Sequence, residues 1–242
     1  MTRESLAIID QIASLPKDWH QAGSVSLDVL LAIARYGEEC GGFRRTAETG
    51  VGRTTLLFSH LSDDHVVFSL DNGRSLSQTK CSSLLRAERV RFVEGPTQRT
   101  VPQHLFEKDL QAVLIDGPHG YPFPDIEYYY FYPHLAAGGI LIIDDVNIPS
   151  IARMLDILRA DSMFEFRELI GQTAFLTRTD QPAINPYGND WWLQGYNRKF
   201  YEDSTRPPNL SRRFLRRLSG FTPRIIKTSL PAPLQERLRR FM

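Results

Sequence analysis

Three aspartates and one histidine near the middle of the sequence have side chains suited to metal binding and proton transfer. Asp144 and Asp145 directly follow the apolar run Ile140–Ile143. Asp116 ends an earlier apolar run, and His119 comes three residues after it. A histidine exchanges protons near neutral pH and can act as a general base. Aspartates that converge on one site repel one another unless a hard cation such as Mg²⁺ lies between them. The pattern predicts metal-assisted acid–base chemistry if the fold brings these residues together.

Each of these residues also has an ordinary structural alternative. Acids often end strands, so Asp144 could cap a following helix and Asp145 could point into solvent. His119 could hydrogen-bond to the backbone of its own loop, whereas His134 fits a packing or capping role. The position of Asp116 at the end of a second apolar run favours the metal interpretation.

A glycine-rich turn and the acids that follow it indicate a nucleoside-containing cofactor. In AETGVGRTT, Gly50 and Gly52 permit a tight turn and close approach of a ligand, and the helix that begins near Thr54 offers free N–H groups. Asp71 lies 19 residues beyond Gly52, close to the offset of roughly 20 residues at which an acid meets ribose hydroxyls. The end of the next expected strand places Glu94–Thr97 where an adenine edge would lie.

From Phe43 onward, apolar runs alternate with helical stretches, which is the signature of a parallel sheet covered by helices. Strands are expected at 43–48, 65–71, 89–95, 111–117 and 139–145, and helices at 53–62, 74–86, 100–108, 125–135 and 149–161. Residues 164–179 are expected to form two antiparallel strands at a sheet edge. Ligands of such sheets bind beyond the C-terminal ends of the strands, where the glycine turn and the aspartates lie.

The segments that flank this alternating core suggest three parts. Residues 1–42, with an amphipathic helix at 24–40, are expected to form a helical cap, and 43–180 the cofactor-binding core. Residues 181–242 form an aromatic-rich and basic extension, which could be a substrate wall or an oligomer contact. From Arg198 onward the chain has 12 Lys and Arg against 3 Asp and Glu. We expect this basic segment to pack on its own body or in a homo-oligomer, and attraction to an anionic ligand or membrane surface is the alternative.

The turn after the first strand resembles the first motif of class I S-adenosylmethionine (SAM) methyltransferases. Its pattern here is Glu-x-Gly-x-Gly-x-Thr, and the acid Glu48 would repel a pyrophosphate but suits a ligand that carries an ammonium and a sulfonium group. The resemblance extends from about Phe43 to Thr179. It implies a Rossmann-like α/β fold with a doubly wound, mostly parallel sheet of seven strands. It also implies SAM as the cofactor, held by residues that include Glu48, Gly50, Gly52, Thr54, Asp71, Glu94 and Thr97.

A second stretch, from LIDGPHGYP to LAAGGILIIDD, resembles the IDG-x-H and DD motifs of a subgroup that contains small-molecule and sugar O-methyltransferases. The resemblance implies a Mg²⁺ or similar ion at Asp116, Asp144 and Asp145. His119 is then the catalytic base, acting beside Asp116 on a sugar or secondary-metabolite hydroxyl. The prolines Pro118, Pro122 and Pro124 depart from the pattern and leave the shape of this loop open.

Other functions remain as alternatives. Relatives with the same signature include hydroxylases, and a degenerate domain could serve as a non-catalytic interaction module. Nucleic-acid methylation is disfavoured, because DGPHGYP stands where an Asn/Asp-Pro-Pro-aromatic motif would be needed. No apolar run reaches the roughly 20 residues of a membrane span, and the acidic N-terminal stretch does not resemble a signal peptide, so we expect a cytoplasmic protein.

Overall fold

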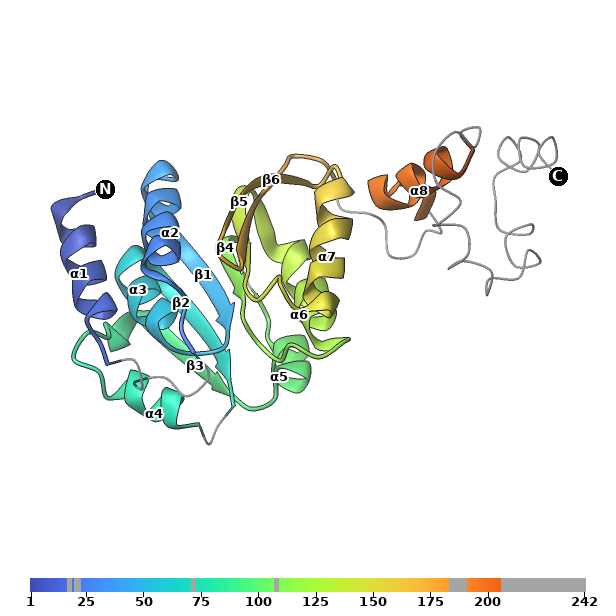
Figure 1. Cartoon of the computed structure of the whole chain (residues 1–242). Coiled ribbons are helices and arrows are strands. Elements are labelled where there is room, and N and C mark those ends of the chain that lie inside the picture. The colour runs from blue at the N-terminus through green and yellow to red at the C-terminus, as the bar shows by residue number, and fades with distance from the viewer. Residues whose placement is uncertain (17–18, 20–22, 71–72, 107–108, 183–190, 206–242) are drawn as a thin grey trace. The chain divides into compact units, whose positions relative to one another are not determined.

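The computed structural model describes residues 1–16, 19, 23–70, 73–106, 109–182 and 191–205 (Figure 1). Two compact units divide the chain, Met1–Lys199 and Phe200–Met242. The first unit contains the whole sheet.

A sheet of seven strands forms the centre of the first unit, in the order β3-β2-β1-β4-β5-β7-β6. The strands are β1 (Phe43–Thr49), β2 (Ser62–Ser69), β3 (Val90–Glu94), β4 (Leu110–Ile115), β5 (Leu135–Ile143), β6 (Phe164–Ile170) and β7 (Thr173–Arg178). Strands β1 to β5 pair in parallel, and β7 runs antiparallel between β5 and β6. This order confirms the predicted doubly wound, mostly parallel α/β fold and the antiparallel pair at its edge.

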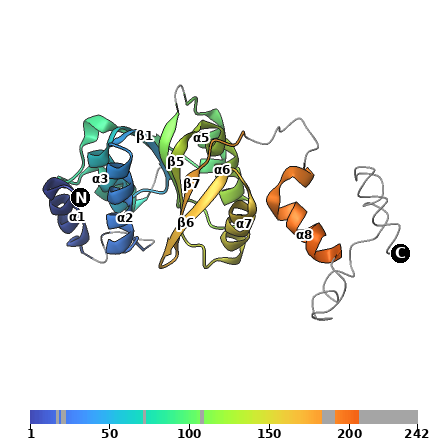
Figure 2. The same ribbon diagram turned by 90° about the horizontal axis from the view of Figure 1, so that it is seen from above.

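Helices cover both faces of this sheet (Figures 1 and 2). They are α1 (Arg3–Ala13), α2 (Leu27–Glu39), α3 (Arg53–Leu61), α4 (Arg74–Lys80), α5 (Thr97–Gln103), α6 (Phe123–Phe131) and α7 (Pro149–Ala160). The chain also contains α8 (Gly195–Thr205) and the short 3₁₀ helices η2 (Ala87–Arg89), η3 (Tyr132–His134) and η4 (Trp191–Leu193). The apolar sides of α1, α2 and α3 form one core cluster with the sheet, and those of α5, α6 and α7 form the other. The expected Rossmann-like layering is therefore present.

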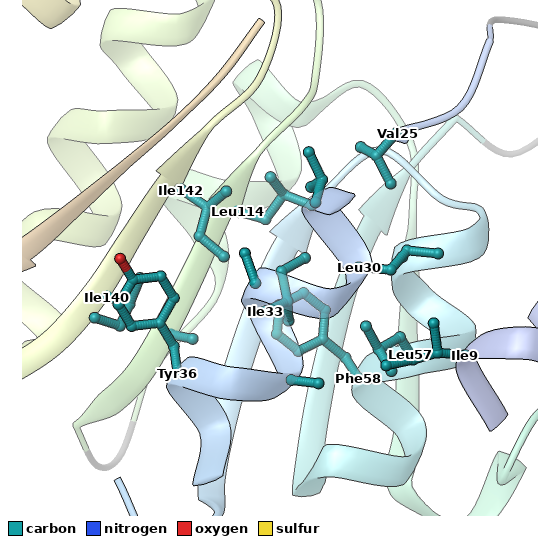
Figure 3. Packing of buried hydrophobic residues seen from close by; sticks show 14 of the residues in the cluster. Ile9, Val25, Leu30, Ile33, Tyr36, Leu57, Phe58, Leu114, Ile140 and Ile142 are labelled. Atoms are coloured by element: carbon teal, nitrogen blue, oxygen red, sulfur yellow. The ribbon is translucent and has the colours of Figure 1, made fainter. Parts of the chain in front are cut away.

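The alternation of side chains along β5 explains the apolar run that precedes the two aspartates. Ile140 and Ile142 belong to the core on the α1–α3 side, where Figure 3 shows them with Leu114. Leu141 and Ile143 belong to the core on the opposite face. Because β5 is covered on both faces, every position of the run is apolar.

Several element boundaries differ from the expected ones. The helix expected at 100–108 is α5, which starts three residues earlier after Pro96 and ends at Gln103, one residue beyond Pro102. The helix expected at 74–86 ends at Lys80. β5 starts at Leu135, four residues before the expected strand, because backbone pairing with β4 extends past its two glycines. Such local boundaries depend on tertiary pairing more than on propensity.

The N-terminal helix expected at 24–40 is α2, which begins after Ser26, whose hydroxyl accepts a hydrogen bond from Val29 N at 3.4 Å. It packs into the core with α1 and α3.

In the extension, Tyr196 of α8 accepts a 2.6 Å hydrogen bond from Arg153 of α7. The predicted boundaries at 42 and 180 stay predictions, and most of the basic segment, 206–242, lies outside the described residues. No helix in the described part of the chain is both long and apolar enough to cross a membrane.

Candidate active site

The ends of β4 and β5 meet at one edge of the sheet and bring the predicted aspartates together. Ile115 pairs with Ile143 as the last partners of the two parallel strands. The backbone N–H of Asp144 donates to Ile115 O at 3.0 Å, so the chain segments after both strands start side by side. This register places the backbone of Asp116 next to that of Asp144 and Asp145, as predicted from the strand ends.

Asp116, His119 and Asp145 form a compact cluster at this edge. His119 Nε2 lies 3.0 Å from Asp145 Oδ2 and 3.7 Å from Asp116 Oδ1. One possible ligand atom from each residue lies within 4.8 Å of the others, and all three side chains are half-buried. The amide of Gln172, between β6 and β7, donates to Asp145 Oδ1. These three residues could hold a metal ion, or share a proton.

Asp144 lies apart from this cluster in a more buried position. Its side chain is 7% exposed, and its Oδ1 accepts a 2.5 Å hydrogen bond from Thr173 of β7. Neither ordinary structural alternative for Asp144 and Asp145 is found. Asp144 does not cap α7, because Ile148 is the residue that precedes this helix. Asp145 does not simply point into solvent, because it contacts His119. The cluster contains two of the three aspartates predicted to bind metal, with His119 beside them. The metal assignment itself stays a prediction.

The electrostatics of the cluster favour positive charge. Burial raises the pKa of Asp116 to about 7, and the negative charges of Asp144 and Glu48 add to the effect. The carboxylates of Asp116, Asp145 and Asp144 together raise the pKa of His119. Burial also raises the pKa of Asp144. Carboxyl groups with raised pKa values hold protons that a cation can replace, so the site suits a proton or a metal ion.

A buried glutamate that sequence reasoning missed supports the loop after β4. Glu127 of α6 is fully buried, and its Oε2 accepts a 2.8 Å hydrogen bond from Thr49 Oγ1. The same hydroxyl accepts a 3.0 Å hydrogen bond from the backbone N–H of Asp116. A Cβ on Gly117 would overlap the Glu127 carboxylate, so the loop lies directly against this acid. Burial raises the pKa of Glu127 to about 7.

The helical spacing of the buried residues on α6 could have revealed Glu127. It shares the inward face of α6 with Pro124 and Phe131, at intervals of three and four residues. In the aromatic run that follows it on the same helix, Tyr129 and Tyr130 are exposed, whereas the acid is buried.

The predicted glycine turn after β1 packs against the end of β4. Gly50 has φ 89°, and a Cβ there would lie 2.5 Å from Asp116 O. Gly52 precedes α3, and its N–H donates to Thr55 Oγ1 at 2.9 Å. Thr54 lies buried in the first turn of α3. The turn predicted to hold the cofactor is therefore adjacent to the Asp116 end of the acidic cluster.

The other predicted cofactor residues occupy different environments. Glu48 is fully buried at the end of β1 beside Thr55. Glu94 ends β3 and pairs with Lys80 of α4. Thr97 is buried at the start of α5, and Asp71 lies outside the described residues. Their roles in cofactor binding stay predictions.

Buried polar atoms without a partner gather at the C-terminal ends of the strands. Buried side-chain atoms are almost always hydrogen-bonded, so such atoms indicate a polar ligand or an ordered water. Among the described residues, those near the ends of β1 and β2 include Glu48 Oε2 and Ser69 Oγ. Ser69, the last residue of β2, was not predicted. This distribution fits a polar cofactor that lies across these strand ends.

The chain matches one known protein family in sequence. Residues 47–146, which extend from the end of β1 past Asp145, match a family model described as a methyltransferase domain. No curated protein matches the chain.

Several solved structures share the fold at low sequence identity. One is a protein of Klebsiella pneumoniae proposed to be an O-methyltransferase, with 13% identity, a TM-score of 0.57, and coverage of 71% of this chain and 90% of that chain. Another is the O-methyltransferase TomG of Streptomyces achromogenes, involved in tomaymycin synthesis and solved with SAM, with 14% identity, a TM-score of 0.55, and coverage of 71% and 89%. An rRNA methylase of Streptococcus thermophilus has 14% identity, a TM-score of 0.50, and coverage of 65% and 100%. At these identities the likeness concerns the fold alone.

The packing of Gly117 against Glu127 leads to a prediction about stability. Replacing Gly117 with Ala should lower the free energy of unfolding by about 1 to 3 kcal/mol, because the new Cβ would overlap the buried Glu127 carboxylate and force it away from its hydrogen bond with Thr49. Urea unfolding measures the change. Gly120→Ala in the same loop is the matched control, since its Cβ would lie 3.9 Å from the nearest atom, Phe123 Cδ2. Equal stability of the two variants would contradict the proposed contact.

The raised pKa of Glu127 predicts a pH-dependent stability. The folded state keeps the proton up to about pH 7, whereas the ordinary pKa is 4.5. The stability contributed by this proton is therefore complete below pH 4.5 and is lost as the pH rises through about 7. Relative to wild type, Glu127→Gln should gain about 2 to 3 kcal/mol in unfolding free energy across this interval. Urea unfolding at several pH values tests this, with the exposed Glu88→Gln as control. A parallel pH profile for wild type and Glu127→Gln would be evidence against the raised pKa.

Proposed function

We propose that this chain, a class I SAM-dependent methyltransferase, methylates a hydroxyl group of a sugar or another small molecule with the help of a divalent cation. The observation that carries the proposal is the cluster of Asp116, His119 and Asp145 beside the Gly50 turn. A methyl acceptor bound at this edge would lie between a proton acceptor and the predicted cofactor site.

The cofactor side of the proposal is supported by the strand ends on either side of β1. Gly50 permits a turn whose backbone lies close to Asp116, and the buried hydroxyl of Ser69 has no hydrogen-bond partner in the described protein. Hydroxyl groups of this kind can hydrogen-bond to a ribose or an adenine. The match of residues 47–146 to a methyltransferase domain spans the turn and the acidic cluster.

The acceptor side is supported by the position of His119. Its imidazole lies 3.0 Å from Asp145, and its backbone carbonyl accepts a 2.9 Å hydrogen bond from Ser150 Oγ of α7. These contacts hold the loop at the edge of the sheet, where His119 can take the proton of an acceptor hydroxyl. Asp116 and Asp145 stabilise the imidazolium that results, because both carboxylates face it.

The donor set fits a divalent cation. Asp116 and Asp145 provide carboxylate oxygens, which hard cations prefer, and Asp144 adds negative charge behind them. When bound, the cation would lower the pKa of an acceptor hydroxyl. His119 Nε2 could either accept a proton or serve as a third ligand, and we propose the first role.

TomG, an O-methyltransferase involved in tomaymycin synthesis, shares the fold, and we propose a small-molecule acceptor for this chain by analogy. The rRNA methylase with the same fold makes nucleic acid the competing acceptor class, although the sequence lacks the amino-methylation motif at this loop. We keep homo-oligomer formation and location in the cytoplasm as predictions.

The proposed reaction can be tested by the release of S-adenosylhomocysteine (SAH). The full chain with SAM and Mg²⁺ should release SAH in the presence of at least one member of a panel of sugars, catechols and nucleotide-linked sugars, with one methyl ether formed for each SAH. Mass spectrometry identifies the product. A hydroxylated product without SAH would support the hydroxylase alternative, and methylation of RNA alone would replace the proposed acceptor class.

His119→Gln separates the two possible roles of the histidine. If His119 is the base, kcat should fall by roughly 10² to 10⁴ while Mg²⁺ affinity stays within a few-fold of wild type. Calorimetry of Mg²⁺ binding and steady-state kinetics measure both quantities. His134→Gln, in η3 at the opposite end of β5, is the control. Loss of Mg²⁺ affinity in His119→Gln would instead assign it as a ligand.

The raised pKa of Asp116 predicts that protons compete with the cation. This carboxyl group must lose its proton before it can bind a cation, and it does so near pH 7. Mg²⁺ affinity should therefore rise about tenfold between pH 6 and 8. Calorimetry in buffers of different ionisation enthalpy should detect proton release. An affinity that is constant over this range would contradict a site that contains Asp116.

A further inference from the structure

A chain of polar side chains runs through the apolar layer between the sheet and α3. Its members come from β1, β2 and the first turn of α3, and each is buried with less than 1% exposure. They are Ser62, Thr46, His65, Glu48 and Thr55. Around them the layer is apolar: Figure 3 shows Leu57 and Phe58 of α3 packed in the same core.

The contacts along this chain are continuous. Thr46 Oγ1 lies 2.7 Å from both Ser62 Oγ and His65 Nδ1. His65 Nε2 lies 3.2 Å from Glu48 Oε1, which also accepts a hydrogen bond from Thr55 Oγ1. Thr55 Oγ1 in turn accepts the hydrogen bond from the N–H of Gly52. The chain of contacts therefore links the middle of the sheet to the glycine turn.

The position of the Glu48 carboxylate is held by only a few polar contacts. Its Oε1 meets Thr55 and His65, and its Oε2 is buried without a hydrogen-bond partner in the described protein. His65 itself is fixed on both sides, by the hydrogen bond to Thr46 and by the ring of Phe58, which stacks on it with centroids 4.8 Å apart. His65 is thus the rigid partner that holds Glu48 from the sheet side.

Stability alone does not account for a His–Glu pair in this layer. Removing an acid and an imidazole from water is costly, and well-packed apolar residues of similar size are often at least as stabilising. The pair does, however, fix a carboxylate at the end of β1 and, through Thr55, the first turn of α3. Both features flank the turn that is predicted to bind SAM.

We infer that His65 is a positioning residue for cofactor binding. It acts through Glu48 on the glycine turn that contains Gly50 and Gly52, without touching the cofactor. This inference rests on the proposed SAM-dependent function. His65 is completely buried behind the ring of Phe58, so its effect must pass through the side chains that it contacts.

Calorimetric titration of the full chain with SAH tests the inference in a double-mutant cycle. His65→Asn removes the nitrogen that meets Glu48 and should weaken SAH binding about tenfold, an ordinary coupling for contacting residues. His65→Gln places an amide nitrogen near the Nε2 position and should recover most of the affinity. In a Glu48→Gln background, His65→Asn should change affinity less than twofold. The KM for SAM should follow the affinity, with kcat at saturating SAM nearly unchanged.

Controls separate this role from a general loss of structure. His60 lies in the same region, but its imidazole hydrogen-bonds to Leu84 O and takes no part in the chain of contacts through Glu48. The His60→Asn variant should therefore bind SAH like wild type. If His65→Asn does not fold, Thr46→Val provides a milder variant, which removes the hydrogen bond at Nδ1 and should weaken SAH binding a few-fold. Thermal melting establishes which variants are folded.

The outcomes are distinguishable. Wild-type affinity in folded His65→Asn, or an equal loss in both Glu48 backgrounds, would overturn the role of His65 and leave the methyltransferase assignment intact. A wild-type protein that binds no SAH would overturn the SAM-dependent function and this inference with it.

Discussion

The close approach of β1 and β4 at their C-terminal ends is the constraint on which the site depends. The strands pair in parallel with Glu48 opposite Leu114, so the chain must turn away from β1 directly above the end of β4. At Gly50 the backbone comes so near Asp116 O that a Cβ would lie 2.5 Å from it. A parallel sheet brings such ends to one edge whatever residues they carry. The glycine lets the turn lie against the acidic loop, and this contact joins the two halves of the site.

Each half of the site rests on a buried acid. Under the loop after β4, Glu127 contacts Thr49 and packs against Gly117. Under the turn before α3, Glu48 contacts Thr55 and His65. Acids in an apolar layer are costly unless they are hydrogen-bonded or hold a proton, and the raised pKa of Glu127 reflects that cost. Burying these carboxylates thus lowers the stability of the fold, but they orient the backbone around the predicted cofactor and cation sites.

The sequence by itself determined the fold class and the edge of the sheet at which the candidate site residues lie. Apolar runs of strand length, alternating with helical stretches, indicate a sheet covered on both faces, and the polar residues that end those runs must then lie together. Gly50, Asp116 and Asp145 were identified in this way, because their positions follow from the ends of strands. The antiparallel pair at the edge was also predictable from two strand-like runs separated by Gly171 and Gln172.

Only the tertiary structure decided how the individual side chains are used. Three aspartates were predicted to converge as equals, but Asp144 turns to Thr173 of β7 while His119 joins Asp116 and Asp145. The choice depends on β7, which lies next to β5 although it follows α7 and β6 in sequence. His65 and Ser69 showed no local signal, since a polar residue in an apolar pattern resembles an ordinary surface position. Glu127 showed only its helical spacing with Pro124 and Phe131. Their roles come from contacts between distant segments, which local spacing and propensity do not encode.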